Sequence, residues 1–337
     1  MSEIASCGAR VALVAGGAGF LGAALCARLL REGAFVVCLD NLWTGRREAI
    51  APLLGHRRFQ FVLGDVRALP ALPGPLPTEI WNLACPASPT VWPRDPAGVL
   101  TTSVQGTHAL LALAAASGAR LLHASTSEIY GDPAGPRQHE DDPGRVHCTG
   151  PRACYQEGKR AAEALCAIAR EAGQDVRVAR LFNTYGPGMR ADDGRVVPAF
   201  VAAALAGSPL LLHGDGSQTR CFCFIDDMLD GLCGLMALPT CPPPVNLGSD
   251  APVSMRALAL LVQDLAGSPA LLETTAARPD DPRHRCPDLT RARRLLGWAP
   301  LVGLRQGLAA CLAACLAACL AEAAAPQPRA AEAVTIG

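Results

Sequence analysis

The sequence has no surplus of charge of either sign. Its 337 residues include 30 Lys and Arg against 30 Asp and Glu, which gives a formal net charge of +0 at pH 7. A chain without a global field does not recruit nucleic acid or an anionic membrane through its overall charge. The balance therefore disfavours nucleic-acid and membrane-surface partners.

A signal-peptide pattern and long apolar runs are also not seen in this sequence. The apolar stretch Val11–Ala15 follows the N-terminus almost at once, without the basic, cleavable pattern of a signal peptide. No uninterrupted apolar run approaches the ~20 residues of a membrane span. The Ala-, Leu- and Cys-rich stretch that ends at Glu322 comes closest. We expect a soluble, cytoplasmic protein without a membrane anchor.

The 15 cysteines do not form the pattern of a small disulfide-stapled domain or of a metal site. In a chain of this length we expect reduced thiols, most of them small core residues. Cys311, Cys315 and Cys319 recur with helical spacing, which predicts the buried face of a terminal helix. A metal site is the alternative, although no His or second Cys pair accompanies them. We therefore expect no metal, and a disordered Ala- and Pro-rich tail over residues 323–337.

Short apolar runs alternate with helical patterns in the first half of the chain. This alternation favours an α/β fold, a Rossmann-type doubly wound parallel sheet with a smaller mixed C-terminal substrate lobe. The nucleotide-binding domain is assigned to 8–183 and the smaller lobe to 184–322, but the chain can cross between them more than once. Strands are expected at Val11–Ala15, Phe35–Leu39, Phe59–Leu63, Glu79–Leu83, Arg120–Ala124 and Val176–Leu181. Helices are expected at Gly19–Arg31, Val99–Ala116 and Pro151–Glu171.

A glycine-rich turn, Gly16–Gly22, follows the first expected strand and opens the first helix. Its glycines allow a tight turn and a close backbone approach, and the helix N-terminus attracts a pyrophosphate. Asp40 ends the second strand ~20 residues further on, where a carboxylate accepts hydrogen bonds from ribose hydroxyls. The same charge repels a 2′-phosphate, so NAD is favoured over NADP. Arg46 and Arg47 are the contrary observation, because either can hold such a phosphate.

Tyr155 and Lys159 are four residues apart and therefore share one face of a helix. A free phenol titrates near pH ~10. A nearby cation favours the phenolate and lowers the pKa of the phenol. The pair can then take a proton from a substrate alcohol while a hydride leaves the same carbon.

Hydroxyl and carboxyl side chains follow the strand Arg120–Ala124. In an open parallel sheet, ligands bind at the carboxyl ends of the strands. Thr126 is placed there to hydrogen-bond the substrate alcohol beside Tyr155. Ser127 is ambiguous, and Glu128 is either a site acid or a carboxylate that caps the turn.

The chain resembles the extended short-chain dehydrogenases/reductases and, within them, the UDP-glucuronate decarboxylase (UDP-xylose synthase) family. The resemblance runs from about Arg10 to Leu308. The glycine and Tyr/Lys motifs are common to the superfamily, whereas Pro-Ala-Ser-Pro, Thr-Ser-Glu and Gly-Pro-Arg-Ala-Cys-Tyr are more selective. The matching stretches are Gly16–Gly22, Asp40–Arg46, Leu83–Pro89, Ala124–Asp132, Gly150–Arg160, Arg177–Pro187, Asp193–Val197, Gly216–Arg220, Val245–Gly248, Asp280–Pro282 and Leu296–Trp298.

The resemblance implies an internal redox cycle on a UDP-sugar. Tyr155, supported by Lys159 and Thr126, removes the 4-OH proton of UDP-glucuronate while NAD takes the C4 hydride. The C5 carboxylate is then β to a ketone and leaves as carbon dioxide. C5 is protonated, the hydride returns to C4, and UDP-xylose forms.

The resemblance also implies the site residues. Glu128 and Arg285 serve decarboxylation, with Arg285 near the sugar carboxylate and C5; a surface salt bridge is the alternative role for Arg285. Asp65 borders the adenine or is a plain turn residue. The cofactor residues expected are Gly16, Gly19, Phe20, Leu21, Gly22, Asp40, Asn41, Thr44, Gly45, Asp65, Val66, Leu83, Ala84, Cys85, Thr102, Ala124, Tyr155, Lys159 and Arg195. The substrate residues expected are Pro86, Ala87, Ser88, Asn183, Val197, Arg220 and Arg285, each of which has a plain structural role as its alternative.

Several positions depart from the family pattern without removing a proton-transfer group. They are Asn82 for His, Cys85 for Ser, Val91 and Trp92 for Asn-Tyr, Cys223 and Phe224 for Gln-Tyr, and Cys286 for Lys. They bear on substrate affinity rather than on the reaction class.

Other functions on the same fold stay open. A 4,6-dehydratase is expected to have an Asp-Glu pair where this chain has Ser127 and Glu128, and a 4-epimerase usually lacks a carboxylate there. A decarboxylase that releases the UDP-4-keto-pentose is a further alternative. An NAD-sensing scaffold is the non-enzyme reading. Superfamily members pair through the helices at Val99–Ala116 and Pro151–Glu171, so we expect a homodimer.

Overall fold

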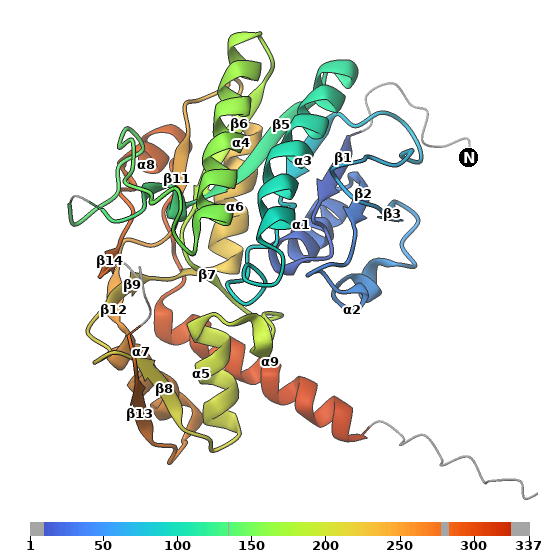
Figure 1. The fold of residues 1–337 in the computed structure, drawn as a ribbon. Helices are drawn as coiled ribbons and strands as arrows, with labels where there is room; N and C mark the ends of the chain where they lie inside the picture. The colour runs from blue at the N-terminus through green and yellow to red at the C-terminus, as the bar shows by residue number, and fades with distance from the viewer. Residues whose placement is uncertain (1–9, 134, 278–282, 325–337) are drawn as a thin grey trace, which may run out of the picture.

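The computed structural model describes residues 10–133, 135–277 and 283–324. The Asp280–Pro282 stretch and the tail from residue 325 therefore lie outside the described residues. Two layers of helices enclose a parallel sheet, and a smaller lobe lies below its carboxyl edge (Figure 1). The predicted α/β class and the mixed second lobe are confirmed.

The large sheet has seven parallel strands in the order β11-β6-β5-β4-β1-β2-β3. The residues of β1 and β2 are buried throughout, as expected for apolar strands covered on both faces. The strands are β1 (Val11–Ala15), β2 (Phe35–Asp40), β3 (Phe59–Leu63), β4 (Glu79–Asn82), β5 (Arg120–Thr126), β6 (Val176–Leu181) and β11 (Val245–Leu247).

Two pairs of helices cover the faces of this sheet. α3 (Pro96–Ser117) packs on α4 (Ala153–Glu171) over one face, and α1 (Phe20–Arg31) meets α6 (Ile225–Ala237) over the other (Figure 1). The short helices α2 (Arg47–Ile50) and η1 (Ala51–Leu53) follow β2. α8 (Thr290–Leu296) packs beside β11.

Residues after 184 return to the large sheet. They supply its outermost strand, β11, and its covering helix α6. The chain thus crosses between the lobes more than once, as the sequence left open.

The smaller lobe combines short strands with three helices. β9 (Thr219–Cys221) lies between β12 (Pro252–Ser254) and β14 (His284–Arg285), antiparallel to the first and parallel to the second. β8 (Leu210–His213) pairs with β13 (Leu272–Thr275), and β7 (Thr184–Tyr185) with β10 (Cys223–Phe224). The helices are α5 (Val196–Leu205), α7 (Met255–Ala266) and α9 (Leu304–Ala324), with the single turn η3 (Ala191–Asp193) before α5; the turn η2 (Ser127–Tyr130) directly follows β5 of the large sheet.

The predicted terminal helix exists, but its cysteine stripe is buried only at its start. Cys311 is buried, Cys315 is half-buried and Cys319 is exposed. α9 packs on α5 and α7 and then runs away from the body of the protein (Figure 1), so its second half has no surface to cover it. The continuously buried face was therefore a wrong prediction, and the helix continues to Ala324, past the predicted start of the tail.

Among the described helices, α3 passes the length and composition test for a membrane span. The scored window has a mean hydropathy of 1.3 and is 44% buried. The C-terminal stretch remains the longest uninterrupted apolar run of the sequence, whereas α3 is interrupted by Thr, Ser, Gln and His. A helix packed between a sheet and another helix has the same apolar composition.

Candidate active site

A cavity of about 630 Å³ runs from the glycine-rich turn to the smaller lobe. It lies beyond the carboxyl ends of β1, β4 and β5, where open parallel sheets bind ligands. The expected site residues that line it are Gly16, Gly19, Phe20, Leu21, Gly22, Thr44, Leu83, Cys85, Ala87, Ser88, Ala124, Thr126, Ser127, Glu128, Tyr155, Lys159, Asn183, Arg195, Val197, Arg220 and Arg285.

A smaller cavity of about 70 Å³ adjoins it through shared glycine-turn residues. The expected residues that it adds are Asp40, Asn41, Val66, Ala84, Pro86 and Thr102. Gly45 and Asp65 line neither cavity. Asp65 is bound to the Arg67 guanidinium, which with other hydrogen bonds lowers the pKa of this carboxyl to about 2, and this geometry fits the turn role.

The glycine-rich turn fits a dinucleotide. Gly16 has a φ of +78°, and a Cβ there would lie 2.8 Å from the backbone of Leu83. A Cβ at Gly22 would lie 2.1 Å from the Gly16 oxygen, so neither position accepts a side chain. The loop backbone is thereby free to approach a pyrophosphate at the N-terminus of α1.

Asp40 and Thr102 fit the adenosine end of the same ligand. The Asp40 carboxylate accepts hydrogen bonds from the Ala18 and Leu42 N–H groups at 3.0 and 2.8 Å, which holds it beside the turn. Burial raises the pKa of Asp40, against these two hydrogen bonds. The buried Thr102 hydroxyl has no hydrogen-bond partner among the described residues, as expected for a group that meets a polar ligand.

The proton-transfer residues meet where β5 ends and α4 begins. The Lys159 ammonium donates to the Ala124 carbonyl at 2.7 Å, and Tyr155 is hydrogen-bonded to Thr126. The Trp92 ring stacks on Tyr155 with centroids 4.8 Å apart and an angle of 16°. A phenol, a hydroxyl and an ammonium thus face one cavity.

The pKa of Tyr155 lies above that of a free phenol, opposite to the direction expected from Lys159. Burial is the main cause and Cys85 adds to it, whereas the Thr126 hydrogen bond and the Arg195 charge lower the pKa. Desolvation penalises the phenolate. In this structure it outweighs the effect of Lys159, whose ammonium is directed at a carbonyl.

Glu128 and Arg285 form a buried ion pair. The Arg285 Nη1 donates to the Glu128 Oε1 at 2.6 Å. Arg152 approaches the same oxygen to 3.3 Å, and Gln156 donates to the other oxygen at 2.9 Å. Burial alone would raise the pKa of Glu128, but the two guanidinium charges and these hydrogen bonds lower it to about 2. Glu128 is therefore a carboxylate at neutral pH.

Neither alternative role, a turn cap for Glu128 or a surface salt bridge for Arg285, fits this pair. Thr126, not Glu128, caps the turn, because its Oγ1 accepts from the Glu128 N–H at 3.2 Å. Arg285 is 8% exposed, so its ion pair is not a surface bridge. The Arg285 Nη2 is buried and has no partner among the described residues, which leaves a donor for a ligand.

The smaller lobe contributes a second arginine to the cavity lining and contacts the loop that follows β4. Arg220 pairs with Arg285 in the register of β9 and β14, and both line the cavity. Arg195 donates to the Ala87 carbonyl at 3.2 Å and lies 3.1 Å from Asp193. The loop that contains Pro86, Ala87 and Ser88 is thus tied to the lobe that carries Asn183 and Val197.

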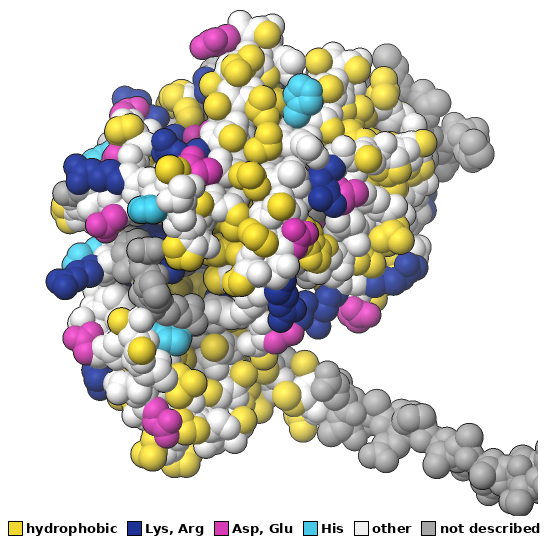
Figure 2. All heavy atoms as spheres, in the orientation of Figure 1, with side chains coloured by type: hydrophobic (Ala, Val, Ile, Leu, Met, Phe, Trp, Pro, Cys, Tyr) yellow, Lys and Arg dark blue, Asp and Glu magenta, His cyan; other side chains and the backbone are white. Residues whose placement is uncertain are grey.

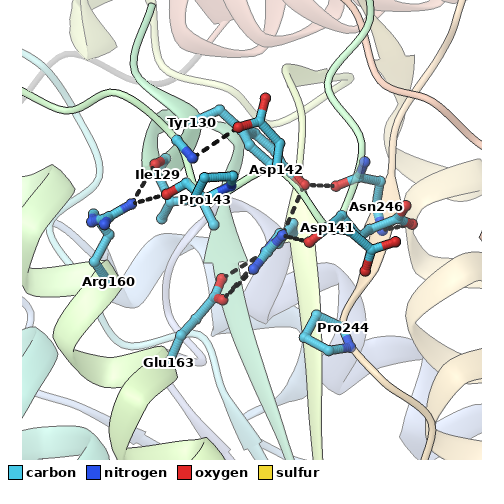
Figure 3. A network of polar contacts seen from close by, with 12 residues as sticks. Ile129, Tyr130, Asp141, Asp142, Pro143, Arg160, Glu163, Pro244 and Asn246 are labelled. Carbon is cyan, nitrogen blue, oxygen red and sulfur yellow. Dashed lines mark hydrogen bonds and ion pairs between the residues drawn. The ribbon is translucent and has the colours of Figure 1, made fainter. Parts of the chain in front are cut away.

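A polar network fixes the turn that carries Ser127 and Glu128 (Figure 3). Glu163 reaches from α4 to bind Arg180 at 2.8 Å, and Arg180 donates to the Tyr130 hydroxyl at 3.0 Å. The Tyr130 hydroxyl donates to Asn246 of β11 at 2.7 Å. Arg160, also on α4, donates to the Ile129 carbonyl at 3.1 Å. The helix that bears Tyr155 and the turn that bears Glu128 are held to one another.

The sequence of residues 12–248 matches the NAD dependent epimerase/dehydratase family. The chain belongs to this family. UDP-glucuronic acid decarboxylase 1 of Xenopus tropicalis is 44% identical over 300 residues, which cover 88% of this chain and 70% of that protein. UDP-glucuronic acid decarboxylase 5 of Arabidopsis thaliana is 44% identical over 301 residues, 88% of this chain and 86% of that protein.

Solved structures of the family share the fold. UDP-glucuronic acid 4-epimerase of Bacillus cereus, in complex with UDP-glucuronic acid and NAD, is 26% identical with a TM-score of 0.81 and covers 91% of this chain and 99% of that one. The dTDP-glucose 4,6-dehydratase of Streptomyces venezuelae, with NAD bound, is 29% identical with a TM-score of 0.80 and covers 90% and 96%. NAD is the cofactor of this family member, and the cradle described above fits it.

Three side chains of this family member were given no role by the sequence. Trp92 stacks on the phenol, and Arg152 and Gln156 hold Glu128. Arg152 and Gln156 are four residues apart around Tyr155, and that spacing is a signal for a shared helix face. A further signal is that Lys159 is the only lysine in the sequence, where every other strongly basic residue is arginine.

Proposed function

We propose that the chain converts UDP-glucuronate to UDP-xylose and carbon dioxide with no net use of NAD. The observation that carries the proposal is the shared cavity. The Tyr155, Thr126 and Lys159 set and the buried Glu128–Arg285 pair line it together. An alcohol and a neighbouring carboxylate of one sugar can then meet both sets. Relatives named UDP-glucuronic acid decarboxylases, 44% identical over most of the chain, support the substrate.

Tyr155 is the base and later the acid at the sugar 4-OH. When bound, NAD supplies the hydride acceptor at C4 and returns the hydride at the end. Thr126 orients the phenol, and Lys159 supplies a positive charge on the same helix face. A well-placed acid or base contributes about 10²–10⁴-fold to such a step.

Decarboxylation follows from the ketone at C4. The C5 carboxylate is then β to a carbonyl, so the C5–C6 bond breaks and its electron pair becomes an enolate. Arg285 offers its free Nη2 to the substrate, held in place through Nη1 by Glu128. Because Glu128 is ionised, its role is to position Arg285 rather than to store a proton at neutral pH.

Arg220 serves the diphosphate in this proposal. A guanidinium makes two parallel hydrogen bonds to phosphate oxygens. The position of Arg220 beside Arg285, with both lining the cavity, supports it. Asn183 and Val197 line the same cavity.

We further propose a cytosolic homodimer that pairs through α3 and α4. In Figure 2 many yellow side chains, interspersed with white ones and with few charged groups, lie over the region of these helices, and Leu100 and Ile168 are among the exposed apolar residues. The cysteines of the described residues are free thiols, which suits a reducing compartment.

Proton NMR of the purified protein with UDP-glucuronate and catalytic NAD tests the reaction. UDP-xylose, with new protons at C5 and no accumulated NADH, is the expected result. UDP-galacturonate would mean a 4-epimerase, and a 4-keto pentose with stoichiometric NADH would mean release before re-reduction. The Tyr155→Phe variant provides the unreacted baseline.

A further inference from the structure

Two cysteines lie directly behind the two cavity arginines. In the parallel pair β9 and β14, Thr219 aligns with His284 and Arg220 with Arg285. The Thr219 hydroxyl and the His284 Nδ1 are 2.9 Å apart, so these two side chains share one face. Side chains alternate along a strand, and the arginines face the cavity on the other side. The next residues, Cys221 and Cys286, return to the Thr219–His284 face.

The continued register of β9 and β14 makes Cys221 and Cys286 neighbours, and only Cys286 keeps any exposed surface. Cys221 is fully buried, whereas Cys286 keeps 7% of its surface exposed. The Cys286 backbone is fixed on both sides by Gln138, through hydrogen bonds of 2.8 and 2.9 Å. Neither thiol has an assigned role in the reaction.

The surroundings of Cys286 lower the pKa of its thiol, although its Sγ also lies 3.8 and 3.9 Å from the carbonyl oxygens of Asp250 and Pro287. The hydrogen bond from Cys221 is the largest cause and lowers the pKa of Cys286 to about 7, against burial. Arg137 lowers it further, while Asp250 and Asp288 raise it. Arg137 and Arg293 both bind Asp250, at 3.4 and 2.8 Å, and so offset its charge. The pKa of Cys221 is raised by the same contact.

A second thiol pair shows that proximity of two cysteines is not enough to make one of them reactive. Cys26 and Cys38 also lie in contact, beneath the glycine-rich turn, but both are fully buried. Burial raises the pKa of Cys26 well above the usual value. A buried, protonated thiol is unreactive.

We propose that Cys286 and Cys221 form a redox modification site, which peroxide closes to a reversible disulfide that displaces Arg220 and Arg285. The Cys286 thiolate attacks the O–O bond of hydrogen peroxide, which gives a sulfenic acid and, with one proton, water. The Cys221 thiol then attacks the Cys286 sulfur, the S–S bond forms, and a second water leaves. Two electrons pass from the sulfurs to the peroxide, and a dithiol reductant restores both thiols.

Closing the bond moves the arginines because each is covalently next to one of the cysteines. The two sulfurs must approach to ~2.05 Å in a disulfide. The strands β9 and β14 therefore shift on the side opposite the cavity. A misplacement of ~1 Å in a positioning group can cost about 10²-fold in rate. The effect on turnover rests on the proposed function, but the disulfide does not.

The site itself is tested by mass. Full-length protein is reduced, desalted, treated with hydrogen peroxide and alkylated. We expect a loss of two hydrogens and a tryptic link between the peptides that begin at Cys221 and at Cys286, directly after Arg220 and Arg285. Alkylation of both cysteines after peroxide, or oxidation of Cys286 that stops short of a disulfide, would overturn the proposal.

The effect of the disulfide on the active site is tested by measuring UDP binding. Calorimetry should show at least about tenfold weaker binding after oxidation, with recovery after dithiothreitol. Cys286→Ser removes the partly exposed thiol and should keep its affinity for UDP after peroxide treatment. Cys221→Ala, which removes the partner thiol, is the second variant. Cys319→Ser, which removes an exposed thiol on α9, should respond as the wild type does. A disulfide with unchanged UDP affinity would refute the coupling, whereas reduced protein that binds UDP but makes no UDP-xylose would refute only the proposed reaction.

Discussion

The phenol of Tyr155 is held in a state that resists ionisation. Trp92 covers one of its faces, and the indole is itself anchored by a 2.9 Å hydrogen bond to the Pro86 carbonyl. Burial is the main cause of the raised pKa of Tyr155. Burial therefore favours the protonated phenol in the protein without ligands.

Trp92→Ala should lower the pKa of Tyr155 toward that of a free phenol, because water then reaches the ring. A base with a lower pKa is ionised at lower pH, so the acid limb of the kcat/KM profile should move to lower pH. Trp92→Phe keeps an aromatic cover and is the control, with a smaller shift. An acid limb that stays in place in Trp92→Ala would contradict this account.

The Glu128–Arg285 pair leads to a second prediction, which is independent of the one for Trp92. Arg285→Ala should reduce the rate of carbon dioxide release by about 10²-fold or more. The substitution also leaves the buried Glu128 carboxylate with less positive charge around it. Release of labelled carbon dioxide measures the loss. Arg305→Ala, which breaks an exposed ion pair on α9, is the matched control and should retain normal turnover. Near-normal turnover by Arg285→Ala would remove this residue from the decarboxylation step.

The same pair gives a pH dependence of stability with a defined sign. The pKa of Glu128 in the folded protein is lowered from 4.5 to about 2, so its contribution is present above the ordinary value. It is lost as the pH falls through this window. Urea unfolding should show wild type losing stability relative to Glu128→Gln between about pH 4.5 and about pH 2. A constant difference across that range would be inconsistent with the ion pair.

At the scale of elements, α4 is both the catalytic helix and an anchor. It carries Tyr155 and Lys159, and through Glu163 and Arg180 it holds the turn with Glu128 (Figure 3). Side-chain exposures of 13% and 11% make the Glu163–Arg180 bridge a buried one. Loss of one partner of a buried bridge leaves an uncompensated charge.

Glu163→Gln should lower the free energy of unfolding by about 3 kcal/mol, the range for a broken buried pair. Glu157→Gln, on the same helix, removes an exposed partner of Arg160 and should change it by less than about 0.5 kcal/mol. Urea denaturation of both variants provides the comparison. Equal effects would show that burial of the bridge does not matter.

Element boundaries were well predicted where a short apolar strand has a local pattern, whereas β5 continues two residues past its predicted end, to Thr126. β1, β3 and β6 begin and end at the expected residues. β11, with three residues, was missed because its strand character depends on pairing with β6. The exposed half of α9 was misjudged because helical spacing identifies a face but not what covers it.

At the scale of the molecule, the outer faces of α3 and α4 are the interface of the proposed homodimer. Ile168 is 63% exposed on α4, which is unusual for a large apolar side chain. Two copies that pair over these helices would bury it.

Ile168→Asp should convert the proposed dimer to a monomer, because the interface would then bury an unpaired charge. Light scattering at micromolar concentration measures the mass. Leu211→Asp, at a 50% exposed leucine on β8 in the other lobe, is the control and should leave the mass unchanged. A wild-type monomer would end the dimer proposal.

The sequence by itself determined the local chemistry of this protein. The glycine-rich turn, the acid that ends β2 and the Tyr155/Lys159 pair each lie within a short stretch. Their function depends on backbone geometry and helix spacing, which neighbouring residues set. The same is true of the strand that delivers Thr126 to the edge of the sheet.

The tertiary structure decided what those groups meet. Glu128 and Arg285 are 157 residues apart and become partners only because β14 joins β9 below the sheet. The stack of Trp92 on Tyr155 and the contact of Cys221 with Cys286 arise in the same way. The hydrophobic periodicity of a sequence predicts on which face of its element a side chain lies, but the partner of that side chain depends on how distant segments pack. Burial, which reversed the expected pKa shift of Tyr155, is likewise a property of the packed molecule.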